Sequence, residues 1–258
     1  MLYFRVLKHY IIIGFLTLFP ASLWAKDAVL HQALSDEAHP RTILVSYPGG
    51  VNICWDTETM NLSFVSRGPI VGSMGSGERE AGHPAAGEDL FKTAQGLPVQ
   101  VLKNAWSPWV PESAHIQEHE DSSADSEEEK TVGKRHPEYT FYGYDLDENQ
   151  FPTFKYGYRE ITVSEKYESK EIDGVISIVR KIYIRGMPDY HMYMRLADTG
   201  SMEIKGKWIN VGDFIKIRLE GVMPVVRNIN GNEELLVVID DEFDFEVIYR
   251  WDEPYTKS

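Results

Sequence analysis

Short segments in which apolar and polar residues alternate run through the second half of this chain, and they constrain its fold most. In residues 243–251 every second side chain, from Phe243 to Trp251, is aromatic or branched, and the intervening ones are mostly charged. A period of two residues is typical of a β-strand that buries one face. After residue 40 no apolar pattern with a helical period is sustained. The chain is therefore expected to be all-β.

Tight turns are predicted between several of these segments. Asp173-Gly174 precedes the apolar run 175–184, and Asn230-Gly231 separates residues 223–229 from 234–239. Such dipeptides favour two-residue hairpins, because glycine adopts positive φ without strain. Regularly spaced strands with turns of this kind indicate an antiparallel β-sandwich with few short helices. A mutarotase-like supersandwich is one form that fits.

The first half of the chain predicts further strands. Residues 51–55 are expected to pair with 61–66 across a turn at 56–59, and residues 41–45 precede them. Residues 26–40 are interpreted as a short helix or a loose lead-in, and the glycine-rich residues 72–90 as a surface loop. We predict one β-sandwich domain over residues 41–252, with a tail over 253–258.

Residues 1–25 have the pattern of an export signal. Arg5 and Lys8 precede an apolar run over residues 10–19, and Ala25 provides a small residue before a cleavage point. The run is shorter than the roughly 20 residues that span a bilayer, so no membrane anchor is expected after cleavage. The mature protein is predicted to be periplasmic or secreted.

Charge and cysteine content narrow the partners and the chemistry. Loss of Arg5 and Lys8 moves the net charge from −14 to −16, a surface that disfavours nucleic acid and anionic lipid. The single cysteine, Cys54, excludes an internal disulfide, and its place in an apolar strand indicates a small buried side chain. No Cys-x-x-Cys-His sequence for covalent haem occurs, and no cofactor is predicted.

A strongly acidic tract over residues 112–134 is interpreted as a flexible insertion, since it contains too little apolar surface to order itself. His115 and His119 have a spacing that would suit a metal on a helix, but the tract has no apolar face that favours a helix. No metal site is therefore predicted.

Aromatic residues provide the candidate ligand-binding side chains. Rings crowd both faces of the hairpin predicted over residues 139–158, and two tryptophans flank Pro108. These rings either fill the core or stack on sugar faces. The tentative ligand-binding set adds two polar residues, one beside the hairpin and one that alternates with Tyr190 and Met192. It consists of Trp106, Trp109, Tyr142, Tyr144, Tyr156, Tyr158, Arg159 and His191.

Charged residues also interrupt apolar strands. Arg180 lies on the same predicted face as Ile178 and Ile182, and Arg195 alternates with methionines. A buried arginine would need a carboxylate partner, so a solvated face or a sheet edge is the preferred placement. Residues 240–242, Asp-Asp-Glu, are interpreted as a solvated turn. Neither a Gly-x-Ser-x-Gly nor a His-Glu-x-x-His motif occurs, and no catalytic residues are predicted.

Several motifs resemble those of a poorly characterised exported bacterial domain. They are carried by residues 40–43, 48–56, 66–70, 141–147, 151–156 and 249–251, which read PRTI, PGGVNICWD, SRGPI, FYGYDLD, FPTFKY and YRW. Relatives of that domain accompany c-type cytochrome or sugar-dehydrogenase-like modules. The resemblance implies a secreted, β-rich domain that works beside redox or carbohydrate-processing machinery, and it supplies no catalytic residues.

These observations lead to one preferred function and two alternatives. The preferred function is a non-catalytic exported module that binds carbohydrate or an envelope protein. The first alternative is a carbohydrate-active enzyme of the mutarotase or glycosidase kind, with His191 or carboxylates moving protons. The second, which rests on the resemblance alone, is an accessory subunit of a periplasmic cytochrome or dehydrogenase assembly.

Overall fold

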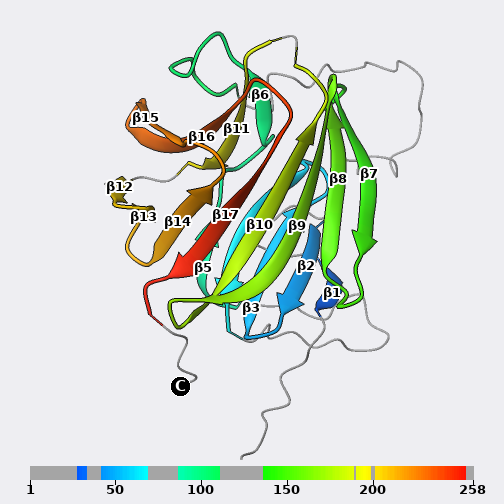
Figure 1. Ribbon diagram of the computed structural model, residues 1–258, viewed down its shortest axis with the longest axis vertical. Helices are drawn as coiled ribbons and strands as arrows, with labels where there is room; N and C mark the ends of the chain where they lie inside the picture. Colours follow the sequence, from blue (N-terminus) through cyan, green and yellow to red (C-terminus); the bar gives the residue numbers. More distant parts are fainter. Residues whose placement is uncertain are drawn as a thin grey trace, which may run out of the picture.

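Three antiparallel sheets and their turns make up the protein in the computed structural model (Figure 1), which describes residues 28–33, 42–68, 87–110, 136–188, 190–198 and 201–253. No helix occurs within these ranges. The sheets pack together as a β-sandwich, so the predicted all-β fold class is confirmed. The export signal, the acidic insertion with His115 and His119, and residues 254–258 of the tail lie outside the described residues.

The sandwich is formed by a sheet of five strands and a sheet of eight. The first has the order β1-β2-β3-β4-β5: β1 Val29–Ala33, β2 Thr42–Tyr47, β3 Val51–Asp56, β4 Asn61–Arg67 and β5 Glu88–Lys92. The second has the order β12-β13-β14-β17-β10-β9-β8-β7: β12 Met202–Lys205, β13 Trp208–Val211, β14 Ile215–Glu220, β17 Phe243–Trp251, β10 Val175–Arg185, β9 Ile161–Ile172, β8 Pro152–Tyr158 and β7 Tyr139–Leu146.

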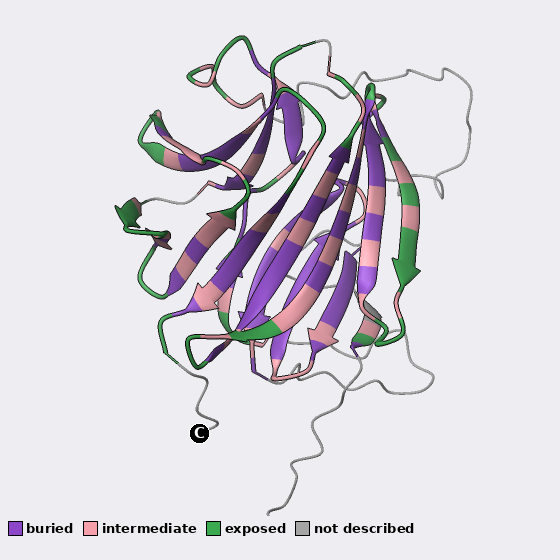
Figure 2. Cartoon of the chain, in the orientation of Figure 1, coloured by how far each residue is buried: buried purple, intermediate pink, exposed green. Residues whose placement is uncertain are grey.

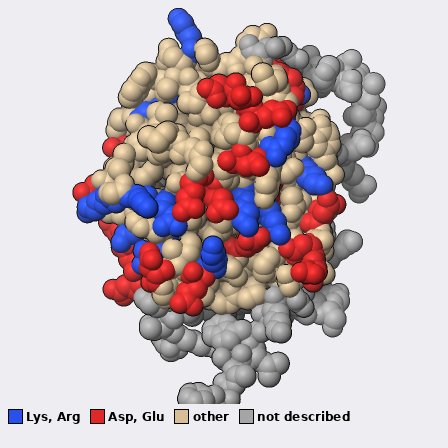
Figure 3. Space-filling model, in the orientation of Figure 1, with Lys and Arg blue, Asp and Glu red and all other residues tan. Residues whose placement is uncertain are grey.

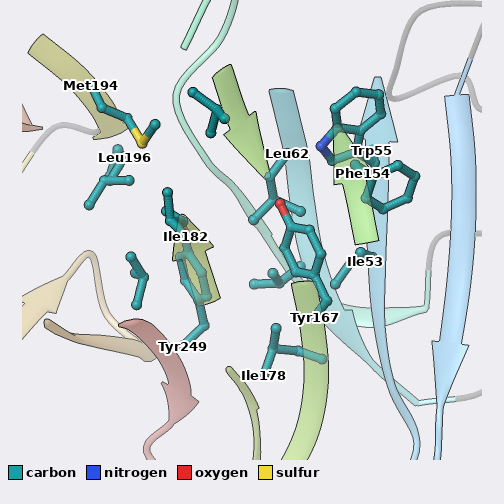
Figure 4. Packing of buried hydrophobic residues seen from close by; sticks show 14 of the residues in the cluster. Ile53, Trp55, Leu62, Phe154, Tyr167, Ile178, Ile182, Met194, Leu196 and Tyr249 are labelled. Carbon is teal, nitrogen blue, oxygen red and sulfur yellow. The ribbon is translucent and has the colours of Figure 1, made fainter. Parts of the chain in front are cut away.

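A third, smaller sheet lies beside the upper part of the eight-stranded sheet in Figure 1. Its order is β15-β16-β11-β6: β15 Val225–Ile229, β16 Asn232–Ile239, β11 Met192–Ala197 and β6 Val99–Val101. One of its faces contributes Met194 and Leu196 to the main core (Figure 4). Its other face forms a separate cluster in which Leu102, Tyr193 and Leu236 are buried.

The predicted hairpins are present, and two strand boundaries differ from expectation. Asp173-Gly174 and Asn230-Gly231 adopt positive φ in the β9–β10 and β15–β16 turns. Residues 26–40 were expected to form a helix or a loose lead-in, yet β1 lies there and pairs with β2. The expected loop over 72–90 is also corrected, because Glu88–Leu90 belong to β5, which pairs with β4. Both segments gain strand structure from pairing partners that local patterns do not reveal.

The core shows how the alternating pattern is used. Buried and partly exposed residues alternate along residues 161–168 of β9, whereas every residue of β3 is buried (Figure 2). Trp55 on β3 stacks on Phe154 of β8, with ring centroids 4.4 Å apart and an interplanar angle of 3° (Figure 4). Cys54 is fully buried between Leu44 and Phe64, which confirms the prediction for this thiol.

A buried ion pair lies inside this apolar core. Glu165 on β9 is fully buried, and Arg180 on β10 is 1% exposed. The guanidinium donates from Nε to Oε2 of Glu165 over 3.1 Å and from Nη2 to Oε1 over 2.6 Å. The preferred placement of Arg180 on a solvated face or sheet edge is therefore wrong. In the sequence, Arg180 shares a strand face with Ile178 and Ile182. The carboxylate that pairs with it belongs to Glu165 on the neighbouring strand β9.

Three neutral donors complete what we call the Glu165 cluster. The Tyr156 hydroxyl donates to Oε1 over 3.0 Å, and the Tyr167 hydroxyl to Oε2 over 2.5 Å. The Trp55 indole donates to Oε2 over 3.4 Å from the opposite sheet. Burial, followed by the nearby carboxylate, raises the pKa of Tyr156 well above its ordinary value. The hydroxyl thus keeps its proton, and the cluster joins the two sheets through satisfied polar groups.

The outward face of the eight-stranded sheet has a different kind of charge pairing. Lys166 bonds Asp147 over 2.9 Å and Glu168 over 3.2 Å, and Lys181 bonds Glu168 over 2.8 Å. Each of these side chains is about a quarter exposed. Basic and acidic side chains adjoin one another across this face in Figure 3. We call these four residues the outer ladder.

Candidate binding site

The register of the third sheet brings three strand ends together. Met192, the first residue of β11, pairs with Val101, the last residue of β6, and with Ile239, the last residue of β16. In antiparallel strands, residues just beyond such a row leave the sheet at the same end of the strands. The residues just beyond these three strand ends therefore lie close together. They are Lys103 after β6, His191 before β11 and Asp240 after β16.

A pocket of about 440 Å³ lies at this end of the third sheet. Its lining residues are Val101, Leu102, Lys103, Pro188, Tyr190, His191 and Asp240. The volume is at the lower end of the range of roughly 300–1,000 Å³ that small-molecule sites occupy. Four of the lining side chains, those of Lys103, Tyr190, His191 and Asp240, are exposed, so they are available to a ligand from solvent.

The polar groups of the pocket are not used within the protein. In the described ranges, neither the Lys103 ammonium nor the Asp240 carboxylate forms an ion pair, although both line the same pocket. The only hydrogen bond of His191 among these residues uses its backbone: the carbonyl accepts the Leu102 N–H over 3.1 Å. A cation, a carboxylate and an imidazole therefore all face solvent with their hydrogen-bonding capacity free.

An arginine holds the aromatic wall of the pocket in place. The guanidinium carbon of Arg159 lies 5.7 Å from the ring centroid of Tyr190 and 5.6 Å from that of Tyr158. Glu138 fixes the same guanidinium through an ion pair of 2.7 Å. A guanidinium over an aromatic face is favourable at these distances. Arg159 thus links the Tyr190 ring to the β8–β9 turn.

The segment that carries Tyr190 is also fixed at its start. The Gly186 N–H donates to Oε1 of Glu242 over 2.6 Å. Gly186 lies so close to the β8–β9 turn that a Cβ atom would be 2.3 Å from the Glu160 carbonyl oxygen. Only glycine fits this approach, and its φ of 97° is one that glycine adopts freely. The expected solvated turn at 240–242 therefore has a structural role as well.

The segment after Lys103 covers the outward face of the third sheet. Trp109 packs against the Leu102–Tyr193–Leu236 cluster, and the guanidinium carbon of Arg195 lies 4.7 Å from its ring centroid. Arg195 is further bound to Glu234 over 3.0 Å. Trp106, by contrast, is 64% exposed. Of the two predicted roles for these tryptophans, Trp109 fills a small core and Trp106 presents its ring to solvent.

The structure separates the predicted ligand-binding residues into two regions and the core. Arg159 and His191 lie at the pocket, and Trp106 lies on the segment that follows Lys103. Tyr142 and Tyr144 are exposed on β7, the edge strand of the eight-stranded sheet. Tyr156 and Tyr158 are buried, at 0% and 4% exposure, so we remove them from the candidate set.

Sequence reasoning missed three residues of the pocket: Lys103, Tyr190 and Asp240. Each lies next to the end of a strand, which is the signal that the chain offers. That signal is insufficient alone, because β6, β11 and β16 are distant in sequence and their pairing was not predicted.

Neither a cluster of metal-ligating side chains nor a membrane-spanning helix occurs in the part of the chain that the structure describes. There, no group of three or more His, Cys, Asp or Glu side chains is arranged to hold a metal ion. The same residues contain no helix of the length and apolarity required to cross a bilayer.

Comparison with known proteins adds no relative to this description. A scan against models of protein families matches none of them, and a search of curated proteins finds no similar sequence.

Proposed function

We propose that this protein is an exported binding module that takes a carbohydrate in the pocket at the end of the third sheet. The observation that carries the proposal is a pocket lined by the exposed Tyr190 ring together with Lys103 and Asp240, two opposite charges that have no partner among the described residues. A sugar has apolar ring faces and a rim of hydroxyl groups. The tyrosine face suits the former, while an ammonium donates to hydroxyls and a carboxylate accepts from them.

The overall charge supports the same ligand class. A net charge of −14 disfavours binding of nucleic acid and anionic lipid. A neutral glycan meets no such repulsion. The export signal predicted over residues 1–25 would bring the pocket to the cell envelope, where glycans are abundant.

The proposal is tested by applying the purified protein to an array of immobilised glycans. Tyr190→Ala and Asp240→Asn are each expected to weaken binding of any glycan by at least about tenfold, because each removes a central contact. Tyr142→Ala is the matched control, since Tyr142 is equally exposed but lies on the β7 edge. Loss of binding in Tyr142→Ala with retention in Tyr190→Ala would move the site to the aromatic hairpin and contradict the proposal.

The same pocket allows the enzymatic alternative to be tested. His191 and Asp240 supply an imidazole and a carboxylate, whereas hydrolysis of a glycosidic bond generally requires two carboxylates. Aldose mutarotation or glycoside turnover by the wild-type protein, abolished in His191→Ala, would establish an enzyme. Binding without turnover favours the module.

A further inference from the structure

We propose that the pocket continues to Trp106 and that its ligand is an oligosaccharide chain, with Tyr190 and Trp106 contacting different sugar units. This inference rests on the proposed function and specifies its ligand class. Exposure alone does not support it, since single exposed apolar residues are common on protein surfaces. The support comes from how the protein holds the turn that carries Trp106.

The Trp106 turn is fixed within its own backbone. The Asn104 side chain accepts the Trp106 N–H through Oδ1 over 2.9 Å, and the Asn104 carbonyl accepts the Ser107 N–H over 3.0 Å. These bonds close a compact turn directly after Lys103, which lines the pocket. These hydrogen bonds hold the backbone that carries the indole.

A buried arginine holds the same turn from below. Nη1 of Arg227 donates to the carbonyls of Ala105 and Ser107, over 2.6 Å in each case. Those two residues flank Trp106 on either side. Arg227 is 2% exposed, and its Nε bonds Glu234 over 2.6 Å. Burying a guanidinium is costly unless its donors are satisfied. Two of the three hydrogen bonds of Arg227 named here hold the Trp106 turn, and the third joins Arg227 to Glu234.

Trp106 differs from Ala105 and Trp109, which both pack against the cluster on the outward face of the third sheet. Trp109 already covers the outward face of the third sheet and is stacked by Arg195. Trp106 contributes to no hydrophobic cluster among the described residues, yet the carbonyls on both sides of it are fixed. A backbone that is already held in the free protein loses little conformational entropy on binding, which is how preorganised sites gain affinity.

Chain geometry places Trp106 within reach of a ligand that occupies the pocket. Trp106 follows Lys103 by three residues, and three residues span at most about 11 Å between Cα atoms. A chain that begins over Tyr190 and passes Lys103 can therefore extend to Trp106 with its second or third sugar.

The test compares glycans of one linkage from one to six sugar units on the same array. For the wild-type protein the apparent affinity is expected to rise about tenfold between the single sugar and the longer chains. Trp106→Ala should remove this gain and leave binding of the single sugar unchanged. Tyr190→Ala should weaken binding at every length. Asn104→Ala keeps the indole but frees the turn, so it should reduce the gain in part.

The outcomes separate this inference from the function it rests on. If Trp106→Ala keeps the dependence on chain length, or if the wild-type protein binds all lengths equally, the extended site is refuted while the pocket stands. If no glycan of any length binds, both are refuted. Tyr142→Ala, which removes an exposed ring on edge strand β7 that does not line the pocket, should behave as wild type at every length. Unchanged circular dichroism of all variants should show that the fold is intact.

Discussion

The Glu165 cluster and the pocket contain similar chemical groups in opposite situations. Both combine a carboxylate, a cation and aromatic side chains. In the cluster, Glu165 and Arg180 are almost fully buried, and five donor atoms satisfy the carboxylate. In the pocket, Lys103 and Asp240 are exposed, and the structure shows no ion pair for either in its described ranges.

This difference indicates which polar groups stabilise the fold and which are available to a ligand. A buried charge whose hydrogen bonds are all made within the protein can contribute to stability and specificity of packing but cannot recognise anything else. A charge at a strand end, with free donors or acceptors beside an exposed ring, contributes little to folding. The charges of the Glu165 cluster therefore serve the fold, whereas those of the pocket are accessible from solvent.

The largest difference is expected in thiol reactivity. Burial, with a further contribution from the Asp56 carboxylate, raises the pKa of Cys54 to about 12, against an ordinary value of 9.0. At pH 8 the reactive thiolate is then about a thousandfold rarer than for an ordinary thiol, and the side chain is also inaccessible. Cys54 should therefore react with a disulfide reagent only at the rate at which the protein unfolds.

A cysteine placed in the pocket serves as the control for that experiment. In Lys103→Cys, one equivalent of thiol should react at the rate of a free thiol while Cys54 stays protected. Rapid labelling of Cys54 in the folded wild-type protein would show that the interior is open and would undermine the comparison.

The next largest effect is expected on breaking the buried ion pair. Arg180→Met removes the only cation that contacts Glu165 in the described structure and leaves a carboxylate in an apolar core. We expect the free energy of unfolding in urea to fall by about 3–5 kcal/mol. In the wild-type protein, burial acts to lower the pKa of Arg180, but the nearby Glu165 carboxylate outweighs this and keeps the pKa above its ordinary value.

The neighbouring residue provides a matched control on the same strand. Lys181→Met removes a cation from the outer ladder, where Glu168 is still paired with Lys166, and should cost less than about 1 kcal/mol. The double variant Glu165→Gln/Arg180→Met should be more stable than Arg180→Met, since no buried charge then remains unpaired and the amide oxygen can still accept a hydrogen bond from the neighbouring hydroxyls. Equal losses from Arg180→Met and Lys181→Met would mean that burial does not distinguish the two pairs.

The smallest effect is expected from the acid titration of the outer ladder. Burial acts to raise the pKa of Glu168, but its bonds to Lys181 and Lys166 outweigh this and hold the pKa below the ordinary 4.5. A lowered pKa in the folded state contributes stability above about pH 4.5 and loses it as pH falls through the folded value. Unfolding at pH 6 and pH 3 should therefore show a smaller acid loss in Lys166→Met than in wild type, by less than about 1 kcal/mol.

Much of the fold was accessible from local sequence patterns. The alternation along residues 243–251 and the Asp173-Gly174 and Asn230-Gly231 turns depend only on neighbouring residues, and each was predicted correctly. The alternation along β10 even placed Arg180 among isoleucines. The alternation did not reveal that Glu165 lies within hydrogen-bonding distance of Arg180, because this depends on how β9 and β10 pair.

The candidate site was only partly accessible for the same reason. Trp106 was chosen as a tryptophan beside a proline, Arg159 as a polar neighbour of the ring-rich hairpin and His191 as a polar residue in an apolar strand. Lys103 and Asp240 were not predicted to bind a ligand. Aromatic content alone also selected Tyr156 and Tyr158, which the core uses.

The sequence by itself determined that this chain forms short antiparallel strands with one small buried thiol, because period and turn chemistry act between adjacent residues. Only the tertiary structure decided which strand ends meet. The row Val101–Met192–Ile239 joins segments that are about 90, 50 and 140 residues apart, and such pairing depends on the packing of whole sheets. That packing buried one set of charges beside Glu165 and left another set open beside Tyr190.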